Sequence, residues 1–127
     1  MLTARSVFPE VYLYEVGRQG VLIACASDCP PLARNLALPP GTQTARDLDG
    51  VVGGVQALLG ARILAPVSFE ALEADLRRQG LTPADWISTD SNLLLEYQTP
   101  RANVQPYLES LERNLAYLRR FSPPEPL

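Results

Sequence analysis

The chain has 127 residues, of which 46% are hydrophobic and 20% are charged, and its formal net charge is -3. This length and composition fit one globular domain with a modest core. All basic residues are arginine and they form no basic stripe, so electrostatics give little support to nucleic-acid binding. The chain has no histidine, which excludes Ser-His-Asp and Cys-His nucleophile systems and histidine-ligated zinc or iron. Acid–base chemistry would fall to Asp, Glu, Tyr or Cys side chains.

Residues 11–26 predict a β-hairpin. The first strand, residues 11–16, is rich in β-branched and aromatic side chains, and a turn with a glycine at each end follows it. Residues 21–26 are apolar at every position, which is typical of a strand buried on both faces. Because a hairpin alone is only marginally stable, this strand needs a neighbour. The candidates are residues 93–98, a missing part of the same protein, or a partner chain.

The two cysteines, Cys25 and Cys29, are too few for a disulfide scaffold or a four-thiolate metal site. We predict that Cys25 is a small buried apolar residue and that Cys29 lies in a loop. We expect no metal site and no cofactor in this chain. No apolar run approaches the roughly 20 residues of a membrane span, and the N-terminus does not resemble a signal peptide. We therefore expect a cytoplasmic protein that does not itself insert into a membrane.

The middle of the chain predicts a proline-rich loop followed by a helix over residues 44–59. An apolar stripe on this helix would comprise residues 48, 51, 52, 55, 58 and 59. Gly50, Gly53 and Gly54 weaken the helix by up to about 1 kcal/mol each relative to alanine. A glycine-rich phosphate-binding loop at these glycines is disfavoured, because no strand precedes it and no lysine follows it.

Two helix starts are recognisable further along. Ser68 is a suitable N-cap for a helix over residues 69–79, with Phe69, Leu72 and Leu76 facing inward. The sequence Thr-Pro-Ala-Asp at residues 82–85 predicts a second, very short helical turn, with a hydroxyl cap and proline at its first position.

The last part of the chain predicts a short strand over residues 93–98 and a final helix over residues 104–121, capped by Asn103. An apolar stripe on this helix comprises Tyr107, Leu108, Leu111, Leu115 and Leu118. Residues 1–121 then form a single small α/β domain, or the C-terminal portion of a larger one, and residues 122–127 form a disordered tail. The expected fold is a β-hairpin plus a further short strand, with about three helices.

Three stretches together carry a resemblance to a known family. Residues 6–9 (SVFP) lead into the predicted hairpin, residues 89–101 contain TDSN, LEY and TPR, and a helix follows from Asn103. This pattern resembles the end of the spermidine synthase-like aminopropyltransferases, and the phrase in residues 89–101 is similar to one in the bacterial, membrane-fused kind. The sequence departs from that phrase at Ser91, where the family usually has a second aspartate.

The resemblance implies a partial Rossmann-like, methyltransferase-type fold. It implies that the parent transfers an aminopropyl group from decarboxylated S-adenosylmethionine to an amine. The glycine-rich nucleotide-binding turn and the catalytic aspartates of that family are not among these residues. The chain would therefore complete the sheet and the substrate cleft of its parent, and would not be active alone. Its partner would be the missing N-terminal part or a second copy, and its location could be the cytoplasmic side of a membrane-anchored parent.

Asp90 is the candidate substrate-binding residue, as a carboxylate at the mouth of the parent's amine cleft. A turn in which the Asp90 side chain accepts a backbone N–H is the structural alternative. We expect Glu96 and Arg101 to pair with each other or with the sheet surface, and Trp86 to be an anchor in the core or an interface. No catalytic residue is assigned within the chain.

Two other functions stay open. The chain could be a stand-alone α/β interaction module that pairs through an exposed strand edge. It could also be a histidine-free enzyme that uses carboxylates such as Asp90 and Glu96.

Overall fold

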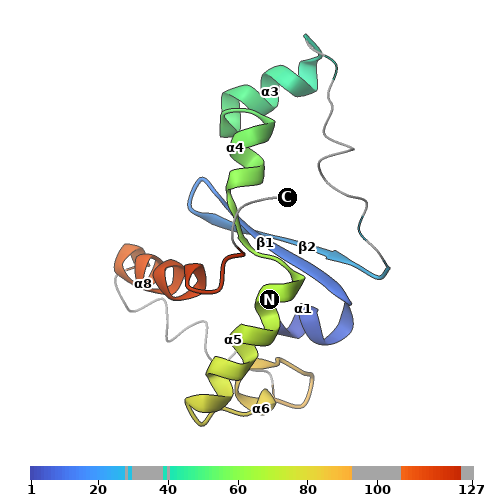
Figure 1. Cartoon of the computed structure of the whole chain (residues 1–127). Coiled ribbons are helices and arrows are strands. Elements are labelled where there is room, and N and C mark those ends of the chain that lie inside the picture. Colours follow the sequence, from blue (N-terminus) through green and yellow to red (C-terminus); the bar gives the residue numbers. More distant parts are fainter. Residues whose placement is uncertain (28, 30–38, 40, 93–106, 124–127) are drawn as a thin grey trace.

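The computed structural model describes residues 1–27, 29, 39, 41–92 and 107–123. Within them the elements are α1 (Leu2–Val7), β1 (Glu10–Val16), β2 (Gln19–Cys25), α3 (Gln43–Val52), α4 (Val55–Gly60), β3 (Arg62–Leu64), α5 (Pro66–Arg78), α6 (Pro83–Trp86) and α8 (Tyr107–Arg119). The strands form one antiparallel sheet in the order β2-β1-β3 (Figure 1). The mixed α/β class is confirmed. The described residues contain six helices, where about three were expected.

The predicted hairpin is present as β1 and β2. Its register runs from Glu10 opposite Cys25 to Val16 opposite Gln19. The turn contains only Gly17 and Arg18, both at positive φ, +58° and +65°. Two such residues make a type I′ turn, whose twist matches that of the flanking strands. β2 therefore begins two residues earlier than the sequence predicts.

The prediction that the second strand is buried on both faces is wrong. Among the described strands β2 lies at the edge of the sheet, and Val21 and Leu22 are 43% and 40% exposed. The central position belongs to β1, because β3 pairs with its other side through Leu13 opposite Leu64. An apolar run is typical of a buried strand, but it does not determine how strands are ordered in a sheet. The expected neighbour, residues 93–98, lies outside the described residues.

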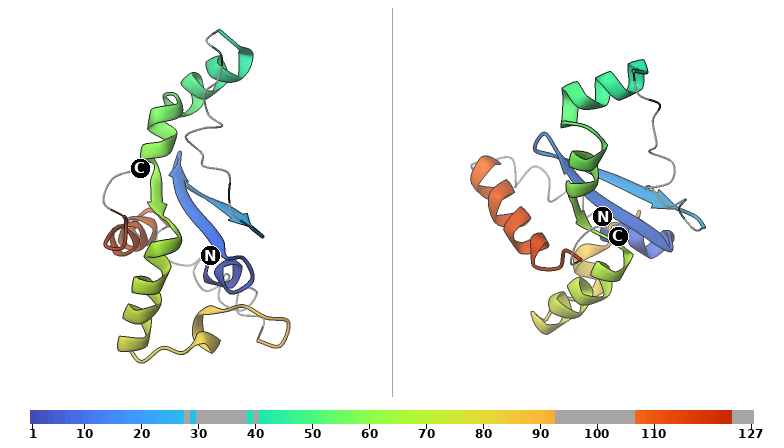
Figure 2. Two further views of the ribbon diagram at one scale, coloured as in Figure 1. Left: turned by 45° about the vertical axis from the view of Figure 1, so that its right-hand side comes forward. Right: turned by 45° about the horizontal axis from the view of Figure 1, so that its top comes forward.

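The core lies where helices cover the hairpin and β3. It comprises the buried residues Leu2, Val11, Ile63, Leu64, Phe69 and Leu72. The predicted inward-facing side chains of α5 are therefore confirmed, with Leu76 packed against the same cluster. Figure 2 shows α5 leaving one end of β3 while α3 and α4 extend beyond the other end.

α5 begins at Pro66, three residues before the predicted start. Proline suits the first helical position, because its missing N–H has no partner there in any helix. Ser68 is not the N-cap. Its Oγ instead accepts a hydrogen bond of 3.2 Å from the N–H of Ala65, the residue that precedes the helix.

The prediction of a single helix over residues 44–59 is wrong, because the chain forms two helices there. Gly53 and Gly54 separate α3 from α4 at φ +78° and +95°, which α-helical backbone does not allow. Neither helix contains a buried residue, and Val51 is 79% exposed. The apolar stripe of this segment therefore does not reach the core.

The short turn α6 is confirmed, and the described part of the final helix, α8, lies within its predicted range. Leu115 and Leu118 of α8 pack against the core, but Leu108, from the same predicted stripe, is 52% exposed. Ser122, the first residue of the predicted tail, donates a 2.8 Å hydrogen bond from its hydroxyl to the carbonyl of Ile63 in β3. Residues 124–127 lie outside the described residues.

Candidate functional site

The outer edge of β2 exposes main-chain hydrogen-bonding groups. In a two-residue hairpin the residues that flank the turn, here Val16 and Gln19, bond to each other, and every second residue after them also faces β1. The N–H and C=O groups of Gly20, Leu22 and Ala24 therefore point away from β1. In the part of the chain that the structure describes, no strand lies on this edge.

The side chains of β2 would not prevent another strand from pairing with that edge. Residues 19–25 contain no charged residue and no proline, which are the usual devices that keep edge strands from pairing. Leu22 lies opposite Leu13, and Ala24 lies opposite Val11, so these two side chains share the face on which the core packs. Val21 and Ile23 lie on the other face. Both faces of the edge are thus apolar.

A disulfide lies at the end of this edge. Cys25, the last residue of β2, is bonded to Cys29, with the two Cα atoms 5.6 Å apart. The prediction that Cys25 is a buried apolar residue is wrong, because it is half-buried and bridged. The Cys29 N–H donates a 2.9 Å hydrogen bond to Glu10 Oε2, and the Tyr12 hydroxyl donates to the same oxygen at 3.2 Å. The spacing of four residues at a strand end was the signal available for this bridge.

A second feature is a cavity of about 390 Å³ between the N-terminus, α5, α6 and α8. Its wall is mainly leucine, together with Trp86, as expected for a side chain that anchors the core. Its polar groups include Asp85, but that carboxylate already accepts from the N–H and the hydroxyl of Thr82 at 2.7 and 2.8 Å. These bonds, the one from the N–H first, hold the pKa of Asp85 below its ordinary value. Asp85 therefore serves as the third residue of a capping box, with Thr82 as the N-cap of α6.

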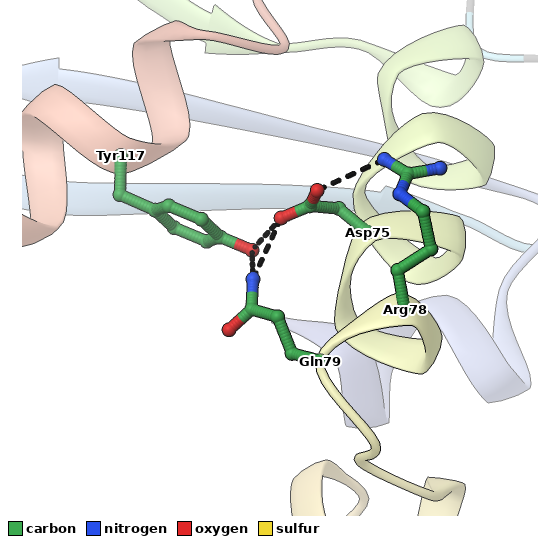
Figure 3. Close-up of polar contacts among 4 residues, drawn as sticks. All are labelled: Asp75, Arg78, Gln79 and Tyr117. Atoms are coloured by element: carbon green, nitrogen blue, oxygen red, sulfur yellow. Dashed lines mark hydrogen bonds and ion pairs between the residues drawn. The ribbon is translucent and has the colours of Figure 1, made fainter.

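A polar cluster joins α5 to α8 beside this cavity (Figure 3). The Tyr117 hydroxyl donates to Asp75 Oδ2 at 2.8 Å, and Arg78 and Gln79 also donate to the Asp75 carboxylate, at 2.9 and 2.7 Å. The bond from Tyr117, followed by that from Arg78, lowers the pKa of Asp75. Burial, followed by the bond to Asp75, raises the pKa of Tyr117. Both shifts move the pKa values further from neutral pH, so the cluster is poorly suited to proton transfer. Its bonds instead hold α5 and α8 together.

The residues around Asp90 form an exposed turn. The Thr89 N–H donates to Asn92 Oδ1 at 2.8 Å, and the Asn92 N–H donates to Thr89 Oγ1 at 3.3 Å. The Ser88 N–H donates to Thr3 Oγ1 at 2.9 Å, which attaches the turn to α1. Asp90 is exposed in this turn and is not among the residues that line the cavity. Its role in substrate binding stays a prediction, and Glu96 and Arg101 lie outside the described residues.

The described residues contain no group of three or more metal-ligating side chains. Among the same residues, no helix combines the length and the apolar character needed to cross a membrane. Comparisons with protein-family models, with curated proteins and with solved structures gave no match.

Proposed function

We propose that this chain works by strand pairing: the outer edge of β2 receives a strand from another polypeptide segment and thereby completes a larger sheet. One observation carries this proposal. In the described sheet β2 is an apolar edge strand without a charged residue or a proline, and Val21 and Leu22 expose about two fifths of their surface. An edge of this kind is a template for a further strand. Main-chain hydrogen bonds would give affinity, and the side chains on both faces would give specificity.

Of the functions left open by the sequence, this geometry favours the interaction module. The enzyme alternative rests on Asp90, which is exposed, and on Glu96, which lies outside the described residues, so it stays a prediction. The carboxylates Asp75 and Asp85 act as structural hydrogen-bond acceptors and lend it no support.

The role implied by the resemblance is a special form of the same proposal. There, the strand on the β2 edge would come from the N-terminal part of a spermidine synthase-like parent, which would also carry the Rossmann-like sheet and the aminopropyl transfer. The β2 edge, on which no described strand lies, supports this form as well as the general one. The family phrase itself lies mostly in residues 93–101, outside the described residues, so the geometry adds nothing to that part of the resemblance.

A synthetic strand tests the pairing function. We expect a seven-residue peptide of alternating threonine and valine to shift and protect the amide signals of Leu22 and Ala24 in nuclear magnetic resonance spectra. Leu22→Pro removes one outward N–H without touching the ladder to β1, and should abolish the effect. Leu22→Thr keeps the N–H and is the matched control. Unchanged Leu22 and Ala24 amides at millimolar peptide would refute the proposal.

A further inference from the structure

We propose that the partner strand is β2 of a second copy of this chain, paired antiparallel about a two-fold axis at Leu22. This inference rests on the proposed function and names its partner. It is drawn from the chemistry of the edge itself, which is complementary to its own copy at positions 20 to 24 of this register.

The main-chain groups match in this register. A two-fold axis at Leu22 places Leu22 opposite Leu22 of the second copy, and Gly20 opposite Ala24 of the second copy. These are the residues whose N–H and C=O groups point away from β1. In an antiparallel ladder such pairs exchange both of their hydrogen bonds. Each outward group of Gly20, Leu22 and Ala24 thus gains a partner, and two three-stranded sheets become one continuous sheet.

The side chains match as well. On one face, Val21 lies opposite Ile23 of the second copy, which is a β-branched pair of the kind that stabilises neighbouring strands. On the other face, Leu22 meets Leu22 of the second copy, and the small residues Gly20 and Ala24 meet each other. When a strand pairs with a second copy of itself, a charged residue near the two-fold axis lies close to the same residue of the second copy. Like charges across a ladder are destabilising. Residues 19–25 contain no charge, so this edge avoids that repulsion.

The symmetry and size of the contact define how it behaves. A two-fold contact uses the same patch on both copies and closes after two, so it forms a dimer and not a fibre. The contact between two seven-residue strands is small compared with the interface of a stable complex, which buries about 1,200 Å² or more of surface. The dimer should therefore be weak and appear only as concentration rises.

Sedimentation velocity of the full chain between about 5 µM and 1 mM tests this inference. We expect a shift from monomer to dimer across that range. Two charge variants test the register. Val21→Lys with Ile23→Lys places like charges opposite each other and should be monomeric at every concentration. Val21→Lys with Ile23→Glu places opposite charges there and should dimerise again.

Wild-type protein also gives a direct readout that depends on no variant. In a mixture of labelled and unlabelled chains, we expect an intermolecular nuclear Overhauser effect between the Hα atoms of Val21 and Ile23. A strict monomer at 1 mM, a dimer without that contact, or folded charge variants that dimerise equally would overturn the inference. If the threonine–valine peptide still binds to a monomeric chain, the pairing function stands and only the identity of the partner is wrong.

Discussion

Tyr117 of α8 contacts α5, and its hydroxyl makes the polar bonds of that contact. It donates to Asp75 in α5 and accepts from Gln79 at 3.1 Å, while its ring makes an edge contact with Phe121 at 5.4 Å between centroids. The Asp75 carboxylate accepts from three side chains in all, which is why its ionised form is favoured. Spacing on one helix predicts the contact with Arg78, but the contact with Tyr117, 42 residues away, follows only from the packed fold.

The Tyr117→Phe variant should lower the free energy of unfolding at neutral pH by about 0.5–1.5 kcal/mol, the net worth of one hydrogen bond. Part of this loss should depend on pH. The folded-state pKa of Asp75 is lowered, so the stabilisation is present above the unfolded-state pKa and disappears as pH falls through the folded-state pKa. Urea unfolding between pH 7 and 2.5 measures the difference from wild type, which should shrink below about pH 4. Asp75→Asn should flatten the same pH dependence. A Tyr117→Phe loss of equal size at pH 2.5 and pH 7 contradicts this account.

At the scale of elements, the segment α3–α4 differs most from its prediction. The spacing of apolar residues over 44–59 fits one continuous helix, but it contains Gly53 and Gly54. Gly53 ends α3 in the left-handed conformation, and its N–H donates to the carbonyl of Asp49 at 3.1 Å. Glycine tolerates this backbone better than other residues, so two adjacent glycines make the break inexpensive. Apolar periodicity alone therefore overestimates the length of this helix.

Two glycine-to-alanine variants distinguish a backbone conformation that requires glycine from the ordinary effect of glycine on helix stability. Gly54→Ala should destabilise the α3–α4 segment by about 1–3 kcal/mol, because φ is +95° there, a backbone conformation that side chains with a Cβ rarely adopt. Gly50→Ala is the matched control. It lies inside α3 with open space around its Cα, and should stabilise the segment by about 0.5–1 kcal/mol. Amide exchange across α3 and α4 measures both changes. Equal effects of the two variants would show that the backbone at Gly54 does not require glycine.

At the scale of the whole molecule, the sequence predicts the hairpin, the short turn α6 and the inward face of α5, because each has a strong local signal. It does not predict β3, whose three residues are too few to show an alternating pattern. The second strand was expected to be buried on both faces because residues 21–26 are all apolar. The pairing of β1 with β3, which the sequence does not reveal, instead places β1 at the centre of the described sheet. The turn around Asp90 shows a similar limit, because residue types alone do not predict the reciprocal bonds between Thr89 and Asn92 that form it.

The disulfide also bears on the whole molecule, because disulfides form and persist mainly in oxidising compartments. Cys25 and Cys29 are joined, and this weighs against the expected cytoplasmic location, which stays a prediction.

The position of the nucleotide site gives a test of the family resemblance at this scale. If the chain is the C-terminal part of a spermidine synthase-like protein, its nucleotide-binding turn lies in another part of the parent. The melting temperature of this chain should then be the same with and without 5′-methylthioadenosine. A ligand at 100 times its Kd would add about 2.7 kcal/mol to the free energy of unfolding, which shifts the melting temperature by several degrees. Adenosine controls for nonspecific effects of the purine ring. A reproducible rise of the melting temperature with 5′-methylthioadenosine, but not with adenosine, would contradict this placement. The cavity of about 390 Å³ beside Trp86 would then be the candidate binding site.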